Sequence, residues 1–177
     1  AFNIQEARRL LGQAKEELGV EKIPPLVLLA NETRQIEAEF IQAQLGTALG
    51  LEIKVDKQTF KQAIAKMEVG DFDLARAAYC GGSLFDPVFF AGIVESNSPF
   101  NDGSYSNKAY DDLIKVTNTT IDAKKRMDAF GQLQSILYRD IPIIPTHESS
   151  MVYLEDRRVK GLQRFPILNF TEGFIAP

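Results

Sequence analysis

Two hydrophobic periods alternate over the first 80 residues, and this alternation is the strongest constraint on the fold. The segments with helical spacing are residues 4–18, 36–49 and 60–67, and those with a strand pattern are residues 24–30, 51–57 and 72–80. The resulting order is helix, strand, helix, strand, helix, strand. Such an order predicts an α/β layer in which crossover helices pack on a largely parallel sheet.

The second half of the chain is less regular. Residues 92–106 are rich in Ser, Asn, Asp, Gly and Pro, which predicts a long surface loop. Asn107 has the side chain to cap a following helix, and a longer helix is predicted after Thr120. Residues 141–162 read as extended, and their prolines indicate an edge or bulged strand.

Composition narrows the classes of function. The chain is 45% hydrophobic and 25% charged, as is ordinary for a globular protein, and its net charge of −4 gives no basic footprint for nucleic acid. No apolar run approaches the roughly 18 residues of a membrane span. One Cys and one His argue against a structural zinc site, so we expect no metal site and no cofactor.

The stretch "FDLARAAYCGGSLFDPVFF", residues 72–90, contains the candidate site residues. Within its strand pattern, Arg76 shares a face with Leu74 and Ala78. A cation among small apolar residues is costly to bury unless it is paired. Its partner could be a structural carboxylate or a ligand carboxylate, bound bidentately in either case, and the structural pairing is favoured.

The predicted strand ends at Cys80-Gly81-Gly82-Ser83. Gly-rich turns can present N–H groups to anions, but this one matches neither the P-loop nor the dinucleotide pattern. Ligands bind beyond the carboxyl ends of strands in open parallel sheets, where glycine lets another backbone approach closely. A structural turn and a ligand-facing turn are equally open on this reasoning.

Cys80 and His147 are the pair that nucleophilic catalysis would need. No local protease signature surrounds either residue, and nothing in the sequence places them together. We therefore interpret Cys80 as a small apolar residue at a strand end and assign no catalytic residue. A Cys-dependent hydrolase is kept as the alternative from the class of enzymes.

Several segments together carry a family resemblance. "IQEARRLLGQAKEELG" resembles a "KAKxLLxEAG" helix, and "PLVLLANET" resembles the strand–helix unit that follows it. The block from "LGLEIKVDK" through "GDFDLARAAYCGGSLFDPVFF", then "YSNKAYDDLI" and "RMDAFGQLQSILYRDIPIIPTH", continue the likeness in the same order. On these segments the chain resembles the family 5 extracellular solute-binding proteins, which include the oligopeptide- and dipeptide-binding proteins of bacterial ABC importers.

The resemblance implies a type II periplasmic-binding-protein-like fold with a mixed, mostly parallel sheet flanked by helices. Residues 1–177 would form a single C-terminal lobe of a two-lobed protein, with the N-terminal lobe and the signal sequence outside this chain. The implied function is the capture of oligopeptides between the lobes for delivery to a membrane permease. The implied protein is a monomeric, non-enzymatic receptor in the periplasm or at the cell surface.

The resemblance also implies a ligand-binding set of Arg76, Tyr79, Cys80, Gly81, Gly82, Ser83 and Asp86. In peptide-binding relatives the Arg can reach a ligand C-terminal carboxylate, and the Cys can form a disulfide with an upstream Cys that this chain lacks. Relatives typically place an Asp at the position of Gly82 to pair with the peptide ammonium. Either Asp86 takes that role, or the ligand is not a free peptide but a sugar, a metal complex or haem.

Overall fold

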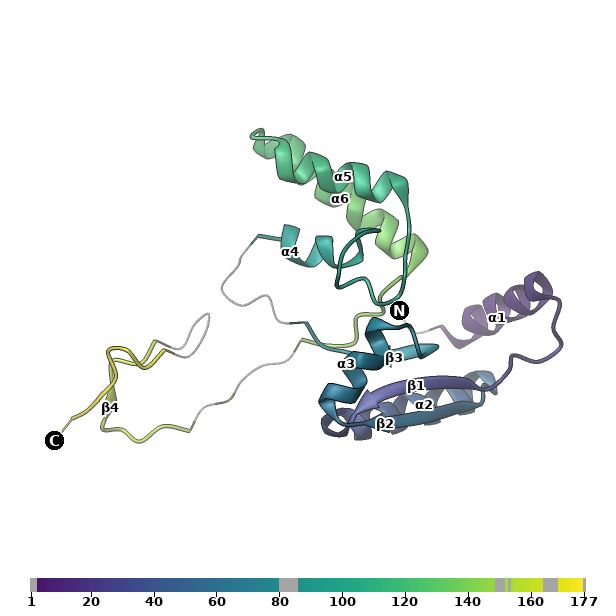
Figure 1. The fold of residues 1–177 in the computed structure, drawn as a ribbon, viewed down its shortest axis with the longest axis horizontal. Coiled ribbons are helices and arrows are strands. Elements are labelled where there is room, and N and C mark those ends of the chain that lie inside the picture. The colour runs from purple at the N-terminus through teal and green to yellow at the C-terminus, as the bar shows by residue number, and fades with distance from the viewer. Residues whose placement is uncertain (1–2, 80–85, 149–151, 153, 164–168, 177) are drawn as a thin grey trace. The chain divides into compact units, whose positions relative to one another are not determined.

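The computed structural model describes residues 3–79, 86–148, 152, 154–163 and 169–176 (Figure 1). The chain forms two compact units, Ala1–Ala78 and Tyr79–Pro177. The first contains α1 (Ile4–Leu18), β1 (Leu26–Asn31), the 3-10 helix η1 (Glu32–Arg34), α2 (Gln35–Leu49), β2 (Ile53–Gln58), α3 (Phe60–Glu68) and β3 (Leu74–Arg76). The second contains α4 (Val88–Ala91), the 3-10 helix η2 (Gly92–Val94), α5 (Lys108–Thr119), α6 (Ala123–Asp140), β4 (Val159–Lys160) and β5 (Phe174–Ile175).

The strands of the first unit form a parallel sheet in the order β2-β1-β3, as the alternating periods predict. In its register, Leu28 of β1 lies between Val55 of β2 and Leu74 of β3. The connection through α2 runs outward from β1 to β2, and the connection through α3 runs back past β1 to β3. Because both crossovers are expected to be right-handed, their opposite directions place α2 and α3 on opposite faces of the sheet.

The core of this unit lies between the sheet and α2. Leu28, Ala30 and Ile53 from the strands pack with Ala38 of α2, and all four are buried. Leu29 points to the opposite face because successive strand side chains alternate, and it is also buried. The sheet is therefore covered on both faces, as parallel sheets require.

The helical spacing within residues 36–49 predicts one core-facing stripe of Ile36, Phe40, Ile41, Leu45 and Leu49, and this prediction is wrong in part. Ile36 and Phe40 of α2 are 83% and 65% exposed. The face that packs on the sheet instead carries Ala38, Ile41 and Leu45. Apolar residues lie on both sides of this helix, and the small Ala38 side chain lets the helix approach the strands closely.

The third strand is shorter than the predicted 72–80. Just before this strand, the Asp73 carboxylate accepts a 2.7 Å hydrogen bond from the Val27 amide. The side chain thus replaces a backbone carbonyl as the acceptor for that amide. At its other end, Arg76 pairs with Ala30, and β1 ends one residue later at Asn31. Because β1 extends no further, the ladder between β1 and β3 stops there.

The second unit has a helical core. Its buried residues are Ile93, Val94, Tyr110, Ile114 and Leu133. The predicted surface loop of residues 92–106 is thus wrong at its start, because η2 carries Ile93 and Val94 into the core. The Tyr110 hydroxyl satisfies its hydrogen-bonding requirement by donating to the Ala91 carbonyl at 2.7 Å.

The two long helices of this unit begin at side-chain caps. Asn107 accepts from the Ala109 and Tyr110 amides, as predicted, and Asp122 caps α6 by accepting from the Lys125 amide. The extended segment 141–162 contributes only β4 among the described residues, and β4 pairs antiparallel with β5. No helix in the described part of the chain is long and apolar enough to cross a membrane.

Burial predicts how the second unit responds to mutation. Leu133→Ala should lower the free energy of unfolding by about 2–5 kcal/mol, because it opens a cavity in the core. Met127→Ala, on the same helix but 61% exposed, is the matched control and should change it by less than about 0.5 kcal/mol. All tyrosines lie at or after residue 79, so tyrosine near-UV circular dichroism during urea unfolding reports on this unit alone. Equal losses in both variants would contradict the assigned core.

Candidate functional site

The carboxyl edge of the parallel sheet is where a ligand site is expected. The strand order reverses at β1, since the chain leaves β1 for β2 and then returns to β3 on its other side. In open α/β sheets, ligands bind beyond the carboxyl ends of the strands at such a reversal. We therefore expect a ligand site at the residues that follow β1 and at those that end β3.

An arginine–glutamate–arginine cluster occupies this edge. Arg76, the last residue of β3, donates from Nε to Glu37 Oε2 at 2.5 Å, and from Nη1 to the Ala77 carbonyl. Arg34, at the end of η1, donates from Nη1 to the other carboxylate oxygen, Oε1, at 2.8 Å. Glu37 lies in the first turn of α2. One carboxylate is thus shared by two guanidinium groups. The structural pairing predicted for Arg76 is present, but its predicted bidentate geometry is wrong, because only Nε bonds to the carboxylate while Nη1 bonds to the Ala77 carbonyl.

Electrostatics hold Glu37 in its ionised form. Burial would raise the pKa of its carboxyl group, but the hydrogen bonds from Arg34 and Arg76 outweigh burial and hold the pKa below its ordinary value. The Arg76 side chain is 11% exposed, whereas those of Arg34 and Glu37 are 29% and 33% exposed. Arg76 is therefore nearly enclosed, while the carboxylate that pairs with it remains within reach of solvent.

Tyr79 begins the second unit and is tied to the loop before α5. Its hydroxyl lies 3.2 Å from Asp102 Oδ2 and 3.3 Å from the Phe100 carbonyl oxygen. Burial, together with the negative charge of Asp102, raises the pKa of Tyr79 to about 12. The hydroxyl is consequently a neutral donor at physiological pH, and it has protein acceptors already.

Asp86 is engaged in the structure of its own unit. Both of its carboxylate oxygens accept from Arg126 Nη2, at 2.8 and 2.9 Å, and Oδ1 also accepts from the Val88 amide. Arg126 further donates to the Thr117 carbonyl and stacks 5.2 Å from the Phe130 ring centre. A ligand ammonium would have to compete with this ion pair, and the role of Asp86 in binding a ligand stays a prediction.

The remaining predicted site residues fall outside the part of the chain that the structure describes. They are Cys80, Gly81, Gly82 and Ser83. Thr146 Oγ1 lies 3.2 Å from Nδ1 of His147, the base considered for a Cys nucleophile. In the described ranges, no three His, Cys, Asp or Glu side chains gather into a group that could hold a metal ion.

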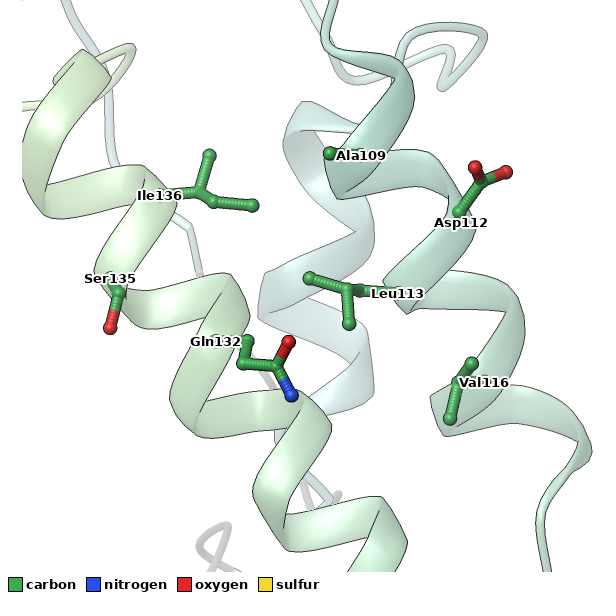
Figure 2. Close-up of a pocket in the computed structure, with 7 residues that line it drawn as sticks. All are labelled: Ala109, Asp112, Leu113, Val116, Gln132, Ser135 and Ile136. Carbon is green, nitrogen blue, oxygen red and sulfur yellow. The ribbon is translucent and has the colours of Figure 1, made fainter.

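A separate pocket of about 550 Å³ lies between α5 and α6 of the second unit (Figure 2). Its lining is Ala109, Asp112, Leu113 and Val116 from α5, and Gln132, Ser135 and Ile136 from α6. The only charged side chain in that lining, Asp112, is paired with Lys108 and Lys115. The pocket contains none of the predicted site residues.

The sequence identified one residue of each ion pair but not the residue that pairs with it. It singled out Arg76 and Asp86 but not Glu37 or Arg126, which lie 39 and 40 positions away along the chain. A weak signal for the first cluster was available, because Arg34 and Glu37 are spaced i,i+3 where a helix begins. No comparable signal linked Asp86 to Arg126.

Several known proteins are similar to this chain in sequence. The chain is 27% identical over 168 residues to the dipeptide-binding protein DppE of Bacillus subtilis, and 29% identical over 167 residues to the periplasmic murein peptide-binding protein MppA of Escherichia coli. Each match covers 93% of this chain but only 31% and 30% of the relative. The chain thus spans about a third of the length of these curated relatives. No protein-family model matches it.

Solved structures agree with the sequence matches. The pheromone receptor PrgZ, described with its mode of peptide binding, superposes with a TM-score of 0.86 at 27% identity, over 99% of this chain and 35% of that one. OppA of Listeria monocytogenes bound to peptide gives a TM-score of 0.84 at 27% identity, over 99% and 34%. The resemblance to the family 5 extracellular solute-binding proteins is confirmed. The predicted α/β fold, with a parallel sheet flanked by helices, is confirmed with it.

The Asp86–Arg126 pair gives a testable pH dependence. Hydrogen bonds from the Val88 amide and from Arg126 lower the pKa of Asp86, so its stabilising contribution is present above the ordinary aspartate range and is lost as the pH falls through the lowered value. Arg126→Gln should raise the pKa of Asp86 toward the ordinary value, as measured by carboxyl ¹³C NMR titration. Lys124→Gln, which removes the partner of Asp128 on the same helix, is the control and should leave it unchanged. If the pKa of Asp86 is the same in Arg126→Gln as in the wild type, the Asp86–Arg126 ion pair is ruled out.

Proposed function

We propose that this chain is the C-terminal ligand-binding lobe of a two-lobed, extracytoplasmic solute receptor that captures oligopeptides for an ABC importer. Its partners are a peptide and the permease subunits of the importer, and the receptor acts as a monomer. The observation that carries the proposal is the likeness, over 99% of the chain, to an OppA structure bound to peptide. The named relatives bind dipeptides, murein peptide or oligopeptides, which supports the same class of ligand.

The mechanism follows from lobe closure. An extended peptide lies along the carboxyl edge of the sheet, where Arg76 ends β3. Backbone hydrogen bonds, as in strand addition, give affinity without reading each side chain. Closure of the second lobe then converts ligand contacts into a shift in the population of closed receptors, which is the form presented to the permease.

We propose further that the receptor is not an enzyme. Cys80 has no role in chemistry under this proposal, so Cys80→Ser should leave peptide binding by the intact receptor unchanged. Binding measured by isothermal titration calorimetry before and after the substitution tests this. A peptide-hydrolysing activity that disappears in Cys80→Ser would instead establish the hydrolase.

Native mass spectrometry of the intact two-lobed protein, purified without denaturation, tests the ligand class. A series of bound masses spaced as amino-acid residues is the expected result. A single bound mass that matches a sugar, a metal complex or haem would replace the peptide with that ligand.

The isolated 177-residue chain should bind peptides only weakly, because half of the contacts of the cleft would come from the other lobe. Calorimetric titration with a tripeptide is expected to give a dissociation constant weaker than about 1 μM, or no detectable heat. Tighter binding by this chain alone would contradict the proposed two-lobed cleft.

A further inference from the structure

The arginine–glutamate–arginine cluster at the sheet edge carries an inference about ligand class, which rests on the function proposed above. Each guanidinium group has five N–H donors in a planar fork that fits a carboxylate. Two such groups facing the same point form an anion-binding site. In this chain the anion is supplied from within, by Glu37 of α2.

Glu37 uses both arginines at once. Each of its oxygens accepts from a different guanidinium, at 2.5 Å from Arg76 and 2.8 Å from Arg34. Arg76 is 11% exposed, so a ligand carboxylate could reach its Nε only by displacing Glu37. Displacement from Arg76 would leave Glu37 paired with Arg34 alone and would place a second negative charge beside it, and both effects oppose binding of a second anion.

We propose that Glu37 is a specificity-determining residue that occupies the arginine pair as an internal ligand. The edge of the sheet beside Arg76 then receives an uncharged stretch of peptide backbone rather than a C-terminal carboxylate. The favoured ligands are peptides that continue past this point or whose C-terminus is blocked. A short peptide ending at Arg76 is disfavoured.

The test compares two probes on the full 177-residue chain. Acetyl-trialanine has a free carboxylate, acetyl-trialaninamide does not, and the acetyl group removes the ammonium from both. Binding is followed by ¹⁵N NMR of the arginine Nε–H groups, which detects weak complexes. The wild-type chain should bind the two probes with affinities within about two-fold of each other. Glu37→Gln keeps the shape of the side chain but frees the arginines, and it should bind the carboxylate probe at least about ten-fold more tightly than the amide.

Matched variants separate this effect from a change in net charge. Glu39→Gln removes the same charge two residues further along α2, where Glu39 accepts from Gln35 and not from an arginine, so it should behave as wild type. Adding Arg76→Gln to Glu37→Gln should abolish the gained preference. Should Glu37→Gln fail to fold, Arg34→Gln with Glu37→Gln removes one charge of each sign and leaves Arg76 free. That double variant should show a smaller preference in the same direction.

Two results would overturn the inference. One is a wild-type chain that already prefers the carboxylate probe about ten-fold, since Glu37 would then not exclude it. The other is a folded Glu37→Gln chain with no preference, or with no binding of either probe. These outcomes are distinct from failure of the proposed function. Absence of peptide from the intact receptor would remove the peptide-importer role, whereas the probe preference of the Glu37→Gln chain reports on the arginine pair itself.

Discussion

The arginine–glutamate–arginine cluster is the constraint on which the carboxyl edge of the sheet depends. Glu37 lies in the first turn of α2, and Arg76 ends β3, so their bond ties the helix that follows β1 to the end of the neighbouring strand. An arginine that is only 11% exposed needs such a partner, because an unpaired charge there would be strongly unfavourable. The same bond therefore fixes the local fold and, under the role proposed for Glu37, fills the place where a ligand anion would bind.

Much of the fold could be predicted because it follows from local patterns. The alternation of hydrophobic periods predicted the parallel sheet, and the Asn107 side chain predicted the start of α5. The incorrect predictions arose where the local pattern allowed two faces of a helix to be buried and packing determined which one was. Ile36 and Phe40 matched a helical stripe as well as Ile41 did, and only the sheet decided which face was covered.

Only one residue of each ion pair, Arg76 and Asp86, could be predicted from the sequence. A cation within an apolar strand marks Arg76 from sequence alone, since burial of the charge demands a partner. The identity of that partner depends on how far apart two elements lie in space, which spacing along the chain does not encode. The same holds for Asp86, whose position before Pro87 indicates a helix start but does not reveal Arg126.

Arg76 and Asp86, the two charged residues expected to bind a ligand, thus each have a partner within their own unit. This affects the interpretation of Gly82, which stands where peptide-binding relatives typically place an Asp. If Asp86 stays with Arg126 and Arg76 stays with Glu37, neither end of a peptide finds a free opposite charge on these two residues. Under the proposed function, recognition beside Arg76 would then come from neutral groups, such as backbone amides and carbonyls. A receptor of that kind selects an extended backbone and leaves the termini of its ligand to be accommodated elsewhere.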